Sequence, residues 1–166
     1  MRFVDFLKAT VLLSAGSATF LASLTVLSVR ADVDPTFMEV AIGWWLAAAL
    51  LGAWLGRRNA ASPPIARLLA DARVQMSLPE LRPGMTLLNR LWPLLLSTIG
   101  AAVLGVFVPQ VSAVAAGFAI IWALAWRRQE AAVAAIEDRD GFRFYIDKTP
   151  PLAPIRLIRT PGLMAG

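Results

Sequence analysis

The sequence predicts an all-α membrane protein: a four-transmembrane-helix bundle with a short cytoplasmic amphipathic helix and a small C-terminal β-hairpin. Three observations lead to this class. The first is composition, because 58% of the 166 residues are hydrophobic even without the 11 glycines, and only 16% are charged. Soluble domains have about 45–50% apolar residues with glycine included, and about 25% charged residues. The second is a set of four long apolar segments, and the third is a one-sided distribution of Lys and Arg.

The four apolar segments are each expected to form a transmembrane helix. They cover residues 9–29, 37–55, 91–107 and 111–126, and a span needs roughly 20 residues, with a range of about 17–25. The first segment also has basic residues before it, as a secretory signal does. Its apolar run is longer than the about 7–15 residues of a signal core, so a retained helix is expected. The short break Val108-Pro109-Gln110 predicts a tight turn between the last two helices.

The distribution of basic residues predicts the orientation of the chain. Fifteen of the 16 Lys and Arg lie before the first segment, between the second and third, or after the fourth. Only Arg30 lies in another loop, close to Asp32 and Asp34. The positive-inside rule then places the N-terminus and C-terminus in the cytoplasm, with the chain in the cell inner (plasma) membrane. Anionic lipid headgroups are the expected partner of this basic face.

Aromatic and basic residues at the cytoplasmic ends of the spans are the expected membrane interface anchors. They are Trp54, Arg57, Arg58, Trp92, Trp126, Arg127 and Arg128.

Residues 57–90 form a connector that is too long for a simple turn. Ser62-Pro63-Pro64 resembles an N-cap followed by Pro at the first helical positions. Apolar residues from Ile65 to Met76 then recur at helical spacing, so the sequence predicts an amphipathic helix that ends before Pro79. This helix is expected either in the headgroup region or packed on the bundle, and the sequence does not decide between them.

The chain divides in this interpretation into a transmembrane domain, residues 1–128, and a cytoplasmic tail, residues 129–166. The tail is expected to continue helically to about Ala135 and then to form a β-hairpin over residues 136–147, because Asp140-Gly141 is a frequent hairpin turn. Residues 155–159 predict a further short strand after the Pro-rich segment 149–154. The acidic run Glu137, Asp138 and Asp140 is interpreted as a solvated turn. The strand after the turn is the predicted docking surface, and its residues are Phe142, Arg143, Phe144, Tyr145 and Ile146.

An isolated ribbon of two or three strands is marginally stable in water. The hairpin is therefore expected to pack on the helix ends, on a second copy or on another protein.

Small residues recur every four positions in each span, which allows close helix packing in lipid. The rows are Ser14, Ala18 and Ala22; Ala48, Gly52 and Gly56; Ser97, Ala101 and Gly105; and Ala115, Ala119 and Ala123.

The residue types leave little chemistry to assign. The chain has no His and no Cys, which removes the usual ligands of haem, zinc and iron–sulfur clusters and the usual nucleophile–base pairs. No ionisable residue lies in the middle of a span, where proton-coupled transporters place one. We therefore expect no catalytic residue, no cofactor and no metal site. The net charge of +5 follows from topology and does not indicate nucleic-acid binding.

The expected function is that of a non-enzymatic structural, accessory or assembly subunit, which docks partners through the connector and the hairpin. A homo-oligomer or a larger membrane complex is the expected assembly. The alternative is a small transporter or channel formed by oligomerisation, with hydroxyl-bearing and glycine-bearing faces along the pore.

Overall fold

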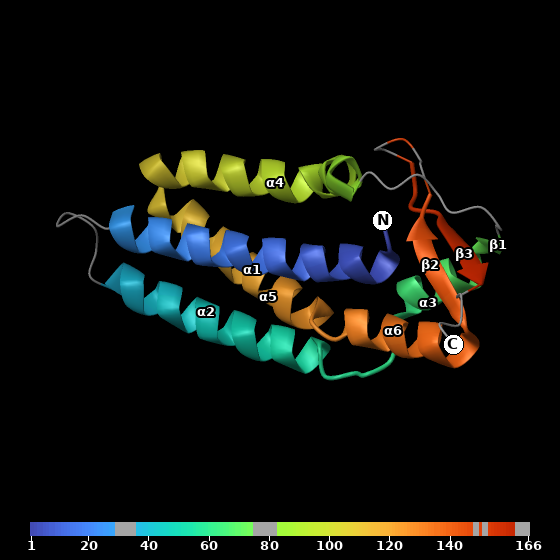
Figure 1. The fold of residues 1–166 in the computed structure, drawn as a ribbon. Coiled ribbons are helices and arrows are strands. Elements are labelled where there is room, and N and C mark those ends of the chain that lie inside the picture. The colour runs from blue at the N-terminus through green and yellow to red at the C-terminus, as the bar shows by residue number, and fades with distance from the viewer. Residues whose placement is uncertain (29–35, 75–82, 148–149, 151–152, 162–166) are drawn as a thin grey trace. The chain divides into compact units, whose positions relative to one another are not determined.

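The computed structural model describes residues 1–28, 36–74, 83–147, 150 and 153–161 (Figure 1). Within these residues the chain is mostly helical and has one small sheet. The elements are α1 (Phe3–Ser28), α2 (Thr36–Leu55), α3 (Pro63–Ala70), β1 (Arg73–Val74), α4 (Pro83–Phe107), α5 (Pro109–Trp126), α6 (Gln129–Asp140), β2 (Phe142–Ile146) and β3 (Leu157–Pro161). The tight turn predicted between the last two spans is confirmed, because Val108 alone separates α4 from α5.

The chain forms two compact units, and neither unit is one continuous stretch of sequence. Unit 1 comprises Met1–Ala9, Arg58–Leu91 and Arg128–Gly166, and unit 2 comprises Thr10–Arg57 and Trp92–Arg127. The segment 129–166 therefore folds together with two earlier parts of the chain.

Within the described residues, four stretches of helix are long and apolar enough to cross a membrane. They are Phe3–Ser28, Thr36–Leu55, Gly84–Phe107 and Pro109–Asp140, the last of which includes α5 and α6. Unit 2 holds most of their apolar length and has only six charged residues: Arg30, Asp32, Asp34, Glu39, Arg57 and Arg127. None lies within residues 40–56 or 92–126, so these helices suit a lipid interior.

The tightest helix contact in unit 2 joins α2 to α5. Trp44 of α2 lies over Gly117 of α5, where a Cβ would overlap the indole ring. Further along, Gly56 lies against the carbonyl of Leu124. Contacts therefore advance in the same direction on both helices, so α2 and α5 are parallel (Figure 1). Glycine permits this approach because it has no Cβ.

Hydroxyl pairs connect α1 to α4 and α5. Thr98 Oγ1 lies 3.1 Å from Ser17 Oγ, and Thr25 Oγ1 lies 2.8 Å from Ser112 Oγ. Ser17, near the middle of α1, contacts Thr98 in the middle of α4. Thr25, near the end of α1, contacts Ser112, which follows the α4–α5 turn. Thus α1 is parallel to α4, and both run opposite to α2 and α5. This alternation is the one expected of a chain that crosses a membrane four times.

The predicted row of small residues coincides with the buried face of α2 but not with that of α5. Ala48, Gly52 and Gly56 are all buried, as predicted. In α5 the buried face instead carries Ser112, Ala113, Ala116, Gly117 and Ala123, so the predicted Ala115–Ala119–Ala123 row shares only its last member with that face. Alanine is so common in this helix that spacing alone does not identify the packed side.

Unit 1 contains a three-stranded sheet in the order β1-β3-β2. Strand β3 pairs antiparallel with β2, with Phe144 opposite Arg159, and parallel with β1. Buried apolar side chains from several elements form the core of this unit: Phe3, Leu7, Ile65, Leu69, Val133, Phe144, Ile146 and Leu157. The strand predicted near residues 155–159 is confirmed as β3.

The predicted hairpin over residues 136–147 is wrong in its first half. Residues 136–140 are the last turns of α6, and Gly141 ends this helix with φ of +69°. Glycine after a helix adopts this left-handed conformation at low cost, so Asp-Gly serves as a helix end here and not as a hairpin turn. The partner of β2 is β3, eleven residues further along the chain. The Pro-rich segment between them lies partly outside the described residues.

The connector helix is shorter than predicted. It begins with Pro63 after Ser62, as expected, but α3 ends at Ala70. The chain then becomes extended, because Arg73 and Val74 pair with β3. A strand-pairing partner that lies more than eighty residues away overrides the helical spacing. Met76, which was part of that spacing, lies outside the described residues, as do Asp32 and Asp34.

Two helices begin earlier than the predicted spans. The first begins at Phe3 and not near residue 9, and α4 begins at Pro83 and not near residue 91. Hydropathy marks only the apolar part of each helix, whereas the additional turns belong to unit 1, where Phe3, Leu7 and Leu91 are buried.

Candidate functional site

Glu137 is the centre of the polar structure of unit 1. It lies one turn before the end of α6, and the Gly141 amide donates to its backbone carbonyl at 3.0 Å. Because Gly141 reverses the chain immediately afterwards, β2 returns past the Glu137 side chain. The side chain has no exposed surface, so its carboxylate depends on protein partners in place of water.

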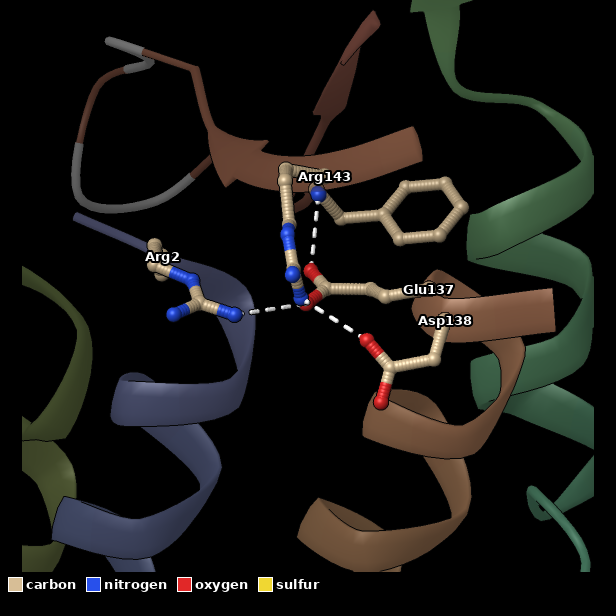
Figure 2. A network of polar contacts seen from close by, with 5 residues as sticks. Arg2, Glu137, Asp138 and Arg143 are labelled. Atoms are coloured by element: carbon tan, nitrogen blue, oxygen red, sulfur yellow. Dashed lines mark hydrogen bonds and ion pairs between the residues drawn. The ribbon is translucent and has the colours of Figure 1, made fainter. Parts of the chain in front are cut away.

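The Glu137 carboxylate accepts three hydrogen bonds (Figure 2). Oε2 accepts from Arg2 Nη2 at 2.7 Å and from Arg143 Nη1 at 3.1 Å. Oε1 accepts from the Phe144 backbone amide at 2.8 Å. Arg143 Nη1 also donates to Asp138 Oδ1 at 3.2 Å. Two guanidinium groups and one amide thus replace the hydration that burial removes.

The two arginines remain in partial contact with solvent, since the Arg2 and Arg143 side chains are 38% and 40% exposed. The hydrogen bond to Glu137 raises the pKa of the Arg2 guanidinium above its ordinary value. Arg2 therefore stays charged at every physiological pH. Since this carboxylate is occupied by three donors, the arrangement orders the chain and offers no ready general base.

The Glu137 site unites the N-terminal and C-terminal parts of the chain. The Ile146 amide donates to the Met1 carbonyl at 3.1 Å, and Arg2 forms an antiparallel bridge with Tyr145. The first two residues therefore extend the sheet beyond β2. Sequence reasoning missed both Glu137 and Arg2, and the interpretation of Glu137 as part of a solvated turn is wrong. Its partners are 135 positions away or on the following strand, so no local pattern reports them.

The connector is joined to the start of α6 by further hydrogen bonds. The Ser62 amide donates to Gln129 Oε1 at 2.8 Å, Gln129 Nε2 donates to the Ala60 carbonyl at 3.5 Å, and Arg128 Nη1, just before α6, donates to Asn59 Oδ1 at 2.7 Å. Gln129 is buried. Ser62 makes no side-chain cap, so its predicted place before the helix is correct although its hydroxyl does not cap it.

The predicted docking residues are divided between the core and the surface of unit 1. Phe144 and Ile146 are buried, whereas Phe142, Arg143 and Tyr145 are partly exposed. The Arg159 guanidinium lies over the Phe142 ring at 5.4 Å from its centroid. The apolar side of β2 is therefore largely covered by the chain itself, and its other residues are the ones that remain accessible.

Four of the predicted interface anchors lie at helix ends in unit 2. Trp54 is in the last turn of α2 and Arg57 lies just beyond that helix, whereas Trp126 is the last residue of α5 and Arg127 follows it directly. Because α2 and α5 are parallel, these four residues belong to the same end of unit 2. Trp92 lies inside α4 and not at its start as predicted, because that helix begins at Pro83. The remaining anchors, Arg58 and Arg128, belong to unit 1.

Within the described residues, no three acidic side chains are grouped so that they could hold a metal ion. No family model, no curated protein and no solved structure matches this chain.

Proposed function

We propose that this chain is a multi-pass protein of the cell inner membrane, in which unit 2 spans the bilayer and unit 1 is a cytoplasmic docking platform. In this proposal the protein has no enzymatic activity of its own. It acts as an accessory or assembly subunit in a homo-oligomer or a larger membrane complex.

The observation that carries the proposal is the convergence of three chain segments in unit 1. These are the segments that precede the first span, join the second to the third, and follow the fourth. They share one sheet and one core, so they belong on one side of a membrane. Thirteen of the 16 Lys and Arg belong to unit 1, and the positive-inside rule makes that side the cytoplasm.

The surface available for docking combines parts of the strand and the connector. Arg143 and Tyr145 are partly exposed on β2, and Arg67 and Arg73 are exposed on α3 and β1. A platform that has its own sheet and its own buried core loses little conformational freedom on binding, which favours its use as a docking surface.

The test compares the size of the complex extracted by mild detergent from cells that express wild-type protein, Glu137→Ala or Asp138→Asn. Glu137→Ala removes the buried acceptor and opens unit 1, whereas Asp138 is 70% exposed and is the matched control. We expect a complex larger than the monomer for wild type and Asp138→Asn, and its loss for Glu137→Ala. An unchanged complex, with hydrogen exchange showing unit 1 open, would refute the docking role.

A second candidate is the small transporter or channel. The observation that favours it is the set of hydroxyls inside unit 2, which includes the buried Thr25–Ser112 pair. Purified protein in liposomes should then pass a small polar solute or ion, and the double variant Thr25→Val/Ser112→Ala should pass it at a different rate. Absence of flux across a broad panel of solutes would exclude this function.

A further inference from the structure

A basic and aromatic surface, here called the anchor end, lies at the C-terminal ends of α2 and α5 in unit 2. Its residues are Trp54, Arg57, Trp122, Trp126 and Arg127. Both arginines are exposed, and Trp54 and Trp122 are 65% and 54% exposed. Trp122 stacks on Trp126 with the ring centroids 5.6 Å apart. Large exposed aromatic side chains next to arginines form an amphipathic surface and not a packed core.

The anchor end is held together by the close packing of α2 on α5. A Cβ at Gly52 would lie 2.9 Å from Leu124 Cβ and 3.0 Å from the Ile121 carbonyl oxygen. Gly56 is closer still to the Leu124 carbonyl. The last turns of the two helices therefore cannot separate without loss of this contact, and their terminal residues stay near one another.

Among the described residues of unit 2, acidic and basic side chains are separated along the helices. Glu39 lies in the first turn of α2, whereas Arg57 and Arg127 belong to the anchor end. Two parallel helix C-termini meet here, and each carries partial negative charge, which the two arginines offset and exceed. The anchor end therefore presents net positive charge beside indole rings.

We propose that the anchor end binds the headgroup of an anionic phospholipid, with Arg57 and Arg127 on the phosphates and the exposed Trp rings at the glycerol and upper acyl region. This inference rests on the proposed membrane insertion of unit 2. It adds to that proposal a selective site at a defined place. The ligand is a lipid and not a free anion, because the tryptophans present apolar surface that a free phosphate would not use.

The test reconstitutes the full-length protein into phosphatidylcholine vesicles that contain brominated lipid and measures quenching of Trp fluorescence. Brominated phosphatidylglycerol is expected to quench wild-type protein at lower mole fraction than brominated phosphatidylcholine does. The preference is the ratio of the mole fractions of the two brominated lipids that give equal quenching. This ratio should fall roughly fivefold in Arg57→Gln and should approach one in Arg57→Gln/Arg127→Gln. The variant Arg57→Lys/Arg127→Lys should keep the wild-type ratio, because the charge remains.

The matched control is Arg73→Gln/Arg139→Gln, which removes two exposed arginines of unit 1 and should leave the preference unchanged. An unchanged preference in Arg57→Gln/Arg127→Gln would overturn the lipid site, as would equal competition by soluble glycerol phosphate. If neither brominated lipid quenches the protein at all, unit 2 is not inserted, and both this inference and the proposed function fail. Quenching without selectivity refutes the lipid site alone.

Discussion

The carboxylate of Glu137 accepts hydrogen bonds from residues at both ends of the chain. Its donors are Arg2 near the N-terminus and Arg143 and Phe144 on β2. A buried charge that loses its partners is far more costly than an exposed one. The contribution of this site is moderated because both arginines are more than a third exposed and are screened by water.

Glu137→Gln should therefore loosen unit 1. The neutral amide is a weaker acceptor for both arginines, and we expect the free energy of opening to fall by about 2 kcal/mol. Hydrogen exchange at the Phe144 and Ile146 amides should accelerate roughly thirtyfold. Asp138→Asn, its exposed neighbour, should change these rates little, and equal acceleration in the two variants would contradict this assignment.

The Thr25–Ser112 pair is the corresponding residue-scale contact inside unit 2. Both side chains are fully buried, and each hydroxyl also lies within hydrogen-bond distance of a carbonyl of its own helix. The two hydroxyls have two protons for three contacts, so one of the contacts goes without a donor at any moment.

Thr25→Val preserves the shape of this side chain and removes its hydroxyl. We expect a loss of about 0.6 kcal/mol, within the range measured for interhelical hydrogen bonds in membranes, because Ser112 keeps the Pro109 carbonyl as its acceptor. Thr19→Val is the control, since Thr19 is exposed and its hydroxyl donates to the Ala15 carbonyl of its own helix. Thermal unfolding in detergent, followed by Trp fluorescence, should separate the two variants.

At the scale of elements, the α2–α5 pair is the best-defined contact of unit 2. Besides the glycine contacts, Trp45 Nε1 donates to the Ala113 carbonyl at 2.9 Å and Trp44 Nε1 donates to the Val114 carbonyl at 3.2 Å. Two indoles thus bind consecutive carbonyls of α5. These bonds and the absence of a Cβ at Gly56 set the register of the two helices.

Gly56→Ala should disrupt this pair, because the new Cβ would overlap the Leu124 carbonyl. We expect a loss of about 1–3 kcal/mol, as in overpacked cores. Gly43→Ala is a matched control in α2, because nothing lies within 4 Å of the added Cβ. Alanine has the higher helix propensity, so this substitution should be neutral or stabilise the protein by up to about 1 kcal/mol. The measurement is thermal unfolding in detergent, and equal melting temperatures would contradict the packing argument.

At the scale of the whole molecule, unit 1 limits the membrane topologies that the chain could adopt. The N-terminal residues, the connector and the tail contribute to one core, so any topology that separates them would break that core. The same arrangement buries Phe144 and Ile146, two of the three apolar residues on that side of β2, within unit 1.

The topology can be measured directly because the chain has no Cys, so each introduced Cys is unique. In right-side-out membrane vesicles, a membrane-impermeant thiol reagent should label Glu39→Cys. It should leave Arg67→Cys and Arg139→Cys unlabelled until the vesicles are opened. All three residues are exposed, so differences report sidedness and not burial. Labelling of Arg139→Cys from outside would reverse the proposed orientation.

Four features could be predicted from the amino-acid sequence: the four apolar helices, the turn at Val108, the charge asymmetry and the alternating strand at Phe142–Ile146. These features depend on local composition and spacing, which hydropathy and periodicity report directly. Three others became known from the fold: Asp140-Gly141 ends a helix, the strand after α3 pairs with β3, and Glu137 is buried against Arg2. Each of those outcomes depends on partners tens of residues away or more, whose pairing energy exceeds the small local preferences between a turn, a helix end and a strand.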